Sequence, residues 1–191
     1  MIRVDTSYAR LVGCIEAICA RMDGYDPSQP DLMSVVARHP RVRRVVPVLT
    51  SPGGPWGRPV ALGDGTYELH VLAAERRGGS VATTDETYER LARRTLAHEL
   101  GHVVYWENQQ DILAAWDKDH LNHSEFEHIP DLFARVFLMP RALLEQKVME
   151  SAALHPGRAM ARLTREFHTV LRTLLPWMQQ TGVTRELPWI L

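Results

Sequence analysis

The sequence has little cysteine and no long apolar segment. Cys14 and Cys19 are its only cysteines, and their five-residue spacing fits neither a Cys-x-x-Cys metal site nor a disulfide framework. We expect both to be small buried side chains. No stretch approaches the roughly 18 apolar residues of a membrane span, and residues 1–11 carry charged side chains where a signal peptide would be apolar. These absences predict a cytoplasmic protein with no membrane partner.

The sequence as a whole has almost no excess of either charge, but two of its segments do. The formal net charge is -1, which by itself identifies no partner. Residues 33–63 nevertheless contain five arginines and no carboxylate, whereas residues 107–131 are acidic. We therefore expect these two segments to face different partners.

The length suits one domain, or a core domain with an appendage. Of the 191 residues 45% are hydrophobic, which is enough to bury a sizeable core without disulfides. We predict a core over residues 1–140, which contains an N-terminal helix, a small sheet and two helices that carry chemistry. Residues 141–191 are predicted to form a C-terminal helical extension packed on that core.

Several segments show a helical period and two are rich in β-branched residues. The predicted helices are Ala9–Met22, Thr83–Glu107, Glu125–Met139, Arg141–Leu154 and Gly157–Gln180. The predicted strands are Val42–Thr50 and Tyr67–Leu72, joined by a hairpin or flap with the loop Ser51–Pro59 at its tip, and Asn108–His123 is expected to be a polar loop. The fold class is α+β, with a small antiparallel or mixed sheet packed on a helical core.

One pentapeptide carries the strongest indication of chemistry. His98, Glu99 and His102 form the pattern His-Glu-Leu-Gly-His within a predicted helix. Side chains four residues apart lie on one helix face, so both imidazoles can bind one metal ion, while the glutamate between them can act on a neighbouring water molecule. The spacing predicts a zinc hydrolase in which Glu99 is the general base.

A catalytic zinc ion normally takes three protein ligands, so a third must come from elsewhere. The pattern His-Glu-x-x-His-x-x-Gly-x-x-His is excluded, because Tyr105 and Asn108 occupy the positions of its glycine and third histidine. A downstream glutamate with a carboxylate four residues later also suits such a site, and Glu127 with Asp131 fits this arrangement. Other residues of the same segment are alternatives: His120, His123, Glu125 and His128.

The motif and the segment after it resemble the ImmA/IrrE family of metallopeptidases. The matching pieces are Arg94-Thr-Leu-Ala-His-Glu-Leu-Gly-His102 and Glu127-x-x-x-Asp131-x-Phe133-Ala134-x-x-Phe137-Leu138-Met139-Pro140. Together they span about a quarter of the chain. Pro130 and Asp131 stand where this family usually has alanine and asparagine, although aspartate is suited to accept an imidazole N–H.

The resemblance implies a zincin-like core with one zinc ion held by His98, His102 and Glu127, and with Asp131 behind a histidine ligand. It also implies an intracellular metallo-endopeptidase that cuts a partner helix-turn-helix repressor and releases mobile-element, DNA-damage or phage-defence genes. We expect a strand such as Tyr67–Leu72 to bind an extended segment of the substrate. A second donor to the oxyanion is also expected, and the candidates are Tyr67, Tyr105, His120, His123 and Arg135.

Two basic clusters are candidates for binding a nucleic-acid trigger. The first lies around Trp56 and consists of Arg38, Arg41, Arg43, Arg44 and Arg58. The second follows one face of the last predicted helix and consists of Arg158, Arg162, Arg165 and Arg172. Cations beside an aromatic ring can bind single-stranded DNA through its phosphates and by base stacking. We hypothesise that single-stranded DNA activates cleavage, the alternative being that both clusters are ordinary solvated surfaces.

Two other classes of function fit part of this pattern. In a non-hydrolytic zinc-containing sensor or DNA-binding protein the metal would be structural, and Glu99 argues against this because a closed structural site has no use for an unliganded glutamate. A zinc hydrolase of a small non-peptide substrate would have a deep enclosed pocket instead of an open groove beside a strand.

Overall fold

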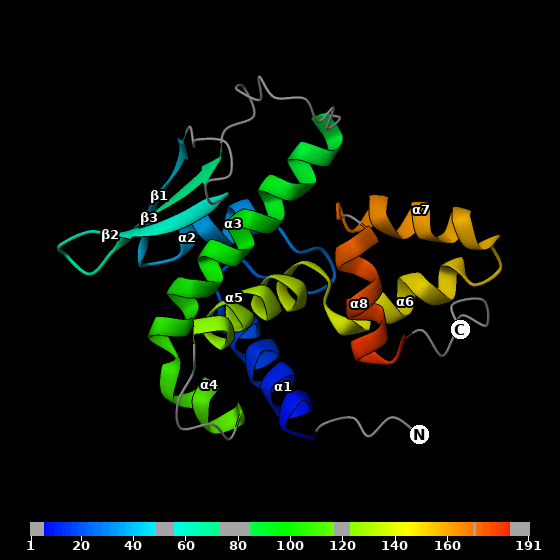
Figure 1. Cartoon of the computed structure of the whole chain (residues 1–191), viewed down its shortest axis with the longest axis horizontal. Helices are drawn as coiled ribbons and strands as arrows, with labels where there is room; N and C mark the ends of the chain where they lie inside the picture. Colours follow the sequence, from blue (N-terminus) through cyan, green and yellow to red (C-terminus); the bar gives the residue numbers. More distant parts are fainter. Residues whose placement is uncertain (1–5, 49–55, 73–84, 117–122, 170, 184–191) are drawn as a thin grey trace.

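A computed structural model of the chain describes residues 6–48, 56–72, 85–116, 123–169 and 171–183. Within these ranges the fold is α+β, as predicted, with a small mixed sheet beside a larger group of helices (Figure 1). The strands are β1 (Val42–Val48), β2 (Gly57–Ala61) and β3 (Tyr67–Leu72). The helices are α1 (Thr6–Arg21), α2 (Leu32–Arg38), α3 (Asp85–Glu107), α4 (Gln109–Trp116), α5 (His123–Leu138), α6 (Arg141–Ser151), α7 (Pro156–Glu166) and α8 (Leu171–Thr181).

The sheet has the order β1-β3-β2, so β3 lies in its centre. β1 runs parallel to β3, and β2 runs antiparallel to it. The predicted hairpin between β1 and β3 is therefore wrong, because parallel neighbours need a crossover connection. The hairpin joins β2 to β3 instead, through a turn in which the Leu62 N–H donates to the Thr66 carbonyl at 2.8 Å and Gly65 takes a φ of 80°.

β2 includes part of the segment that was predicted to be a loop. Residues 57–59 of the predicted loop 51–59 are its first three residues, while residues 51–55 lie outside the described ranges. Pro59 has no backbone N–H and is disfavoured inside a sheet, but β2 is at the edge, where one side of the strand needs no partner. The proline is thus compatible with the strand, and it misled the prediction.

α3 is the helix around which the other elements are packed. It contacts α2, α4 and α5 as well as strands β2 and β3, and Figure 1 shows the sheet and the C-terminal helices on opposite sides of it. Its apolar residues recur at helical spacing and are buried: Leu96, Ala97, Leu100, Val103 and Val104. At its end the Asn108 side-chain amide donates to the Val104 carbonyl at 2.9 Å, which satisfies one of the carbonyls that a helix leaves open.

α1 packs against α4 and α5. Its buried residues Leu11, Ile15 and Ile18 follow the helical period that predicted it. Cys19 is buried as predicted, whereas Cys14 is only partly buried, and both are free thiols.

Four other helices differ from the sequence expectation. Residues 109–116 form α4 instead of a polar loop, because one apolar residue, Ile112, is buried and anchors the turn. The single helix predicted over Gly157–Gln180 is divided into α7 and α8 at His168, whose φ of 46° is incompatible with an α-helix. The short helix α2 was not predicted, although Asp31 caps its start by accepting from the Ser34 N–H at 3.1 Å.

Hydrogen bonds connect the C-terminal helices to earlier segments of the chain, and the predicted boundary at residue 140 stays a prediction. Arg93 of α3 donates to the carbonyls of Phe167, at 3.0 Å, and Pro30, at 3.1 Å. The fully buried Trp177 of α8 donates its indole N–H to the Met139 carbonyl at 3.0 Å. In the described ranges no helix is long and apolar enough to cross a membrane.

α3 and α5 approach each other closely at a glycine of the His-Glu-Leu-Gly-His motif. A Cβ atom on Gly101 would lie 2.8 Å from Cα of Pro130 and 3.1 Å from the ring of Phe133. The first of these neighbours is backbone and cannot move without displacing α5. Glycine is therefore required at this position by the packing of the two helices.

We predict that Gly101→Ala lowers the free energy of unfolding by about 1–3 kcal/mol, because it overpacks the contact between α3 and α5. The measurement is urea denaturation followed by circular dichroism. Gly13→Ala is the matched control, since Gly13 is an exposed α1 residue with no neighbouring atom within 4 Å of an added Cβ. That control should be stabilising by about 0.5–1 kcal/mol. Equal stability of wild type and Gly101→Ala would contradict the packing argument.

Candidate metal centre

Three side chains that could hold a metal ion come together where α3 meets α5. One donor atom from each of His98, His102 and Glu127 lies within 4.8 Å of the other two. Nε2 of His98 is 3.1 Å and Nε2 of His102 is 3.6 Å from the same carboxylate oxygen of Glu127. Two imidazoles and a carboxylate are a donor set that suits a catalytic zinc ion, so these residues fit the predicted site.

A hydrogen bond at Nδ1, on the far side of the ring from the donor group, fixes the orientation of His98. Its Nδ1 lies 2.9 Å from Oδ1 of Asp131, which leaves Nε2 pointing to the side of Glu127. The same carboxylate oxygen accepts a hydrogen bond from Arg94 at 2.6 Å. Burial raises the pKa of Asp131, but the bonds from His98 and the charge of Arg94 outweigh it and hold the pKa below its usual range. Asp131 thus remains a carboxylate that orients the first imidazole, as the sequence predicted.

His102 is the more enclosed of the two histidines. Its ring lies edge-on to that of His98, with centroids 5.0 Å apart, and it also packs against Trp106 and Phe126. Burial, with the neighbouring charge of His98 as the second cause, lowers the pKa of His102 to about 4. The imidazole is therefore neutral near pH 7, which is the form that binds a metal.

Among the alternatives for the third ligand, His128 is the one whose side chain the structure describes. Its ring packs against Tyr8 and Trp116, and it does not belong to the group of converging donor atoms. His120 lies outside the described ranges, as do the side chains of His123 and Glu125. Within the described part of the chain, Glu127 is the residue that completes the group.

Glu99 lies beside this group without joining it. Its side chain is buried, with 5% exposure, and burial raises its pKa to about 7, helped by Glu127 and opposed by His98. The backbone of β2 runs directly against it, because a Cβ atom on Gly57 would lie only 2.7 Å from Oε1 of Glu99. A carboxylate with a pKa near 7 can both accept and release a proton at neutral pH.

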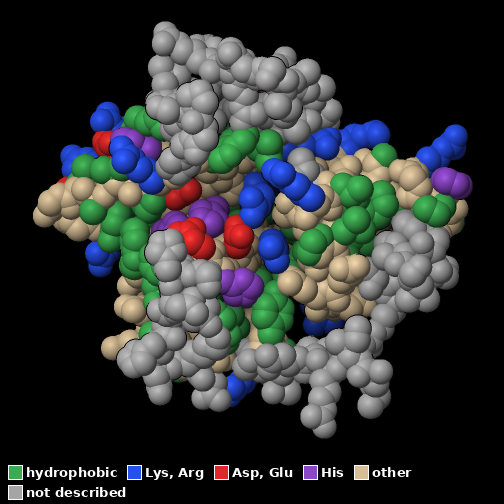
Figure 2. All heavy atoms as spheres, in the orientation of Figure 1, with side chains coloured by type: hydrophobic (Ala, Val, Ile, Leu, Met, Phe, Trp, Pro, Cys, Tyr) green, Lys and Arg blue, Asp and Glu red, His purple; other side chains and the backbone are tan. Residues whose placement is uncertain are grey.

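A cavity of about 660 Å³ opens at these residues. Strand β2 and helices α3, α5 and α8 contribute to its walls, and Figure 2 shows acidic and histidine side chains gathered in a hollow with basic side chains beside them. The lining combines apolar and charged side chains: Trp56, Leu91, Trp106 and Phe126, with Arg58, Arg94, Arg172, His98, Glu99, His102, Glu127 and Asp131. Since Trp56, Trp106 and Glu127 are exposed, the cavity is open to solvent and not a closed chamber.

Sequence reasoning missed that α8 reaches the cavity. Arg172 was grouped with the arginines of α7 because the two helices were predicted as one. Trp106 and Phe126 were also missed, although Trp106 is four residues after His102 in one helix and so shares its face. The position of Arg172 depends on the break at His168, for which the sequence offers no glycine as a signal.

Most arginines of the first basic cluster are engaged in ion pairs. Arg41 lies 3.3 Å from Glu107, Arg43 lies 2.9 Å from Asp64, and Arg44 lies 2.7 Å from Glu68. Arg38 lies 3.6 Å from Asp23. Arg58 is different, because it lines the cavity together with Trp56. The cluster is therefore divided between a paired surface and the cavity wall.

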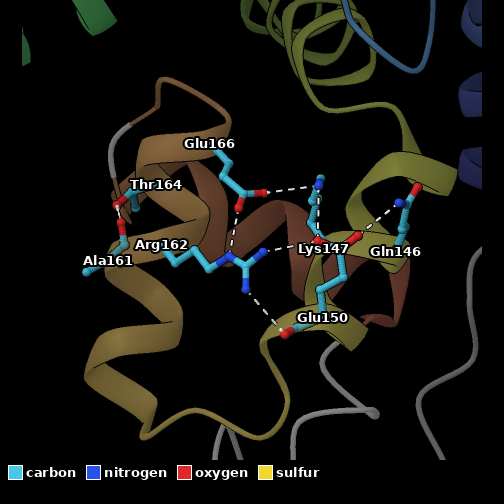
Figure 3. Close-up of polar contacts among 7 residues, drawn as sticks. All are labelled: Gln146, Lys147, Glu150, Ala161, Arg162, Thr164 and Glu166. Atoms are coloured by element: carbon cyan, nitrogen blue, oxygen red, sulfur yellow. Dashed lines mark hydrogen bonds and ion pairs between the residues drawn. The ribbon is translucent and has the colours of Figure 1, made fainter.

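The second basic cluster is divided as well. Arg162 bridges α6 and α7 through Glu150, at 3.1 Å, and Glu166, at 2.7 Å, and Lys147 joins the same network (Figure 3). Arg158 and Arg165 are exposed on α7. Together with the place of Arg172 in the cavity, this leaves no continuous row of four free arginines among the described residues.

The described candidates for a second oxyanion donor lie outside the cavity lining. Tyr67 stacks on Trp106, and the buried Tyr105 accepts a hydrogen bond from Gln109. Arg135 donates to Gln180 of α8. The other two candidates, His120 and the side chain of His123, are outside the described ranges.

Comparison with known proteins adds no assignment. No family model matches the chain, and no curated protein matches it.

We predict that Glu127→Ala abolishes stoichiometric zinc binding and that Asp131→Asn weakens it by about 10- to 100-fold. The first change removes a donor, and the second removes the carboxylate that orients His98. Zinc content after dialysis and competition with a chelator would measure both. Glu145→Ala, which removes an exposed carboxylate paired with Arg141 on α6, is the control that should bind zinc normally. Unchanged zinc affinity in Glu127→Ala would eliminate Glu127 as a ligand.

Proposed function

We propose that the protein is a zinc metallo-endopeptidase. The observation that carries this proposal is Glu99, a buried carboxylate that lies beside three converging donor residues and is not one of them. A structural zinc site uses all its coordination positions and has no role for such a group, whereas a hydrolytic site requires a base next to an open position. The open cavity at the same place supplies room for a substrate.

In this proposal His98, His102 and Glu127 hold the zinc ion, and Asp131 orients His98. When bound there, zinc lowers the pKa of a coordinated water molecule and polarises the scissile carbonyl group. Glu99 accepts the proton of the attacking water and donates it to the leaving nitrogen. The water oxygen first adds to the carbonyl carbon, and the peptide C–N bond then breaks as the leaving nitrogen takes the proton, so Glu99 returns to its carboxylate form.

We infer that an extended substrate pairs with β2. The sequence pointed to Tyr67–Leu72, but this strand, β3, has a partner on each side and offers no free edge. β2 is an edge strand, its residues Gly57 to Pro59 line the cavity, and Gly57 lies against Glu99. Pairing with an edge strand fixes the backbone of a peptide without demanding a particular sequence. An open cavity beside such an edge favours a peptide over a small enclosed substrate.

The resemblance to the ImmA/IrrE family suggests the physiological substrate, a helix-turn-helix repressor encoded beside this gene, and a cytoplasmic location. We propose single-stranded DNA as the activating signal. The exposed Arg158 and Arg165 on α7 are the place at which phosphate contacts would cost no ion pair seen in the described ranges. Phosphates that bound Arg41, Arg43, Arg44 or Arg162 would first have to displace carboxylates.

A non-hydrolytic zinc sensor is the second candidate. It is favoured by the same donor group and by the basic side chains, but it gives no reason for the burial of Glu99 against Gly57. The two candidates differ in one measurable property, which is peptide bond cleavage that depends on Glu99.

We predict that the zinc-loaded protein cuts the adjacent helix-turn-helix repressor and that Glu99→Gln lowers the rate by about 100- to 10,000-fold, because the variant has no base. Electrophoresis and mass spectrometry would follow the cut with and without single-stranded DNA. Zinc binding by the variant should be unchanged, since Glu99 is not in the donor group. Absence of cutting by zinc-loaded wild type in both conditions would favour the sensor or another substrate.

We predict that Gly57→Ala reduces kcat about 10- to 100-fold through misplacement of the base. The added Cβ atom would lie 2.7 Å from both the Glu99 carboxylate and the Thr95 methyl group, so Glu99 has to move. Steady-state kinetics on a cleaved peptide and zinc titration would be compared, with Gly13→Ala as a control far from β2. Equal losses in zinc affinity and rate would show that Gly57 supports the whole site and not the base.

A further inference from the structure

Two arginines from different elements line the same cavity. Arg58 comes from β2 and Arg172 from the first turn of α8, and both line the cavity at the donor group. Both are exposed, and neither forms a hydrogen bond or an ion pair within the described ranges. Figure 2 shows basic side chains next to the acidic and histidine side chains of the hollow. These two guanidinium groups are therefore available to a ligand in the cavity.

The carboxylates of the cavity are already engaged with other groups. Asp131 is bound by Arg94 and His98. Glu127 faces the two histidines as a donor, and Glu99 is buried against β2. With a doubly charged metal ion at the donor group, Glu99 and Glu127 are balanced, and Asp131 is balanced by Arg94. Arg58 and Arg172 then remain as uncompensated positive charges, which favour an anionic ligand.

The position of Arg172 is fixed relative to α3. Arg93 and Arg90 of α3 donate to the carbonyls of Phe167 and Thr169, which lie in the turn just before α8. The residue after Arg172 is Thr173, which is buried with 8% exposure. The start of α8 is thus held to the helix that carries His98 and His102. The backbone that carries Arg172 is therefore already in place at the cavity, so that only its side chain has to be ordered when a ligand binds.

We propose that Arg172 and Arg58 bind a carboxylate group of the substrate peptide next to the metal centre. Guanidinium groups bind carboxylates through paired, charge-assisted hydrogen bonds. The exposed Trp56 and the side chain of Leu91 line the same cavity and provide apolar contact for a residue beside the acidic one. That the bound peptide is a substrate rests on the proposed function, whereas the presence of a carboxylate-binding site does not. The carboxylate belongs either to an Asp or Glu side chain or to the C-terminus of the peptide.

The test measures binding to zinc-loaded Glu99→Gln, so that no cleavage is needed. The probes are fluorescein-labelled peptides of alternating Leu and Ala that differ at one central position, which is Asp in one and Asn in another, both with an amidated C-terminus. A further Asn peptide has a free C-terminal carboxylate. Fluorescence anisotropy gives the affinity of each peptide for zinc-loaded Glu99→Gln. The same measurement is made on three double variants, in which Arg172→Gln, Arg58→Gln or Arg21→Gln is added to Glu99→Gln. Arg21 is an exposed arginine on α1 outside the cavity lining and serves as the control.

The Asp peptide should bind about tenfold more tightly than the amidated Asn peptide, as expected for a charged hydrogen-bonded pair. Arg172→Gln should reduce this ratio to nearly one, Arg58→Gln should reduce it in part, and Arg21→Gln should leave it unchanged. Preference for the free C-terminus over the internal Asp would assign the site to a terminal carboxylate. Equal affinities for all three peptides, including no measurable binding by any, would overturn the proposal. Tight binding of the Asp peptide without its cleavage by wild type would contradict only the proposed function.

Discussion

The direct contact between α3 and α5 at Gly101 and Pro130 sets the distance across which the candidate metal centre is built. Gly101 precedes His102, and Pro130 precedes Asp131 and follows Glu127 by three residues. Any side chain at Gly101 would separate the helices, and the donor atoms of the two helices would move apart with them. Pro130, in the middle of α5, removes one helical hydrogen bond, and its Cα and carbonyl oxygen lie against Gly101. The same helix contact therefore determines both the packing of the core and the distances between the donor atoms of the site.

The electrostatics of the site follow from the same contact. Asp131 is brought under His98 and beside Arg94, so that it stays ionised although it is largely enclosed. Glu99 is covered by β2, and no hydrogen bond from a cationic side chain of the described residues reaches it, so burial raises its pKa to about 7. Glu99 and Asp131, two carboxylates that line the same cavity, therefore acquire different properties. One is fixed as an orienting anion, and the other can exchange a proton.

The sequence predicted the parts of this site that depend on local spacing. The helical period places His98 and His102 on one helix face, and the four-residue spacing of Glu127 and Asp131 does the same for a second helix. The structure brings these two helix faces together. The strand order was not predictable in this way, because parallel pairing of β1 with β3 depends on contacts between distant segments. The Asp64-Gly65 turn before β3 was a local signal for the β2 hairpin that the proline obscured. The break at His168, which brings Arg172 to the cavity, has no glycine or proline to announce it.

The arginines show most clearly how composition and structure differ. In the sequence Arg43, Arg44 and Arg58 form one basic segment, but the β2–β3 hairpin brings Asp64 and Glu68 against the first two. Arg58 lies on the edge strand, forms no ion pair with either of those acids, and lines the cavity instead. α8 contributes a second guanidinium group there, held in place by hydrogen bonds from α3. In the proposed function, a peptide paired with β2 would lie in the cavity that Glu99 and these two arginines line. The edge strand would fix its backbone, and the arginines would select its register by one carboxylate.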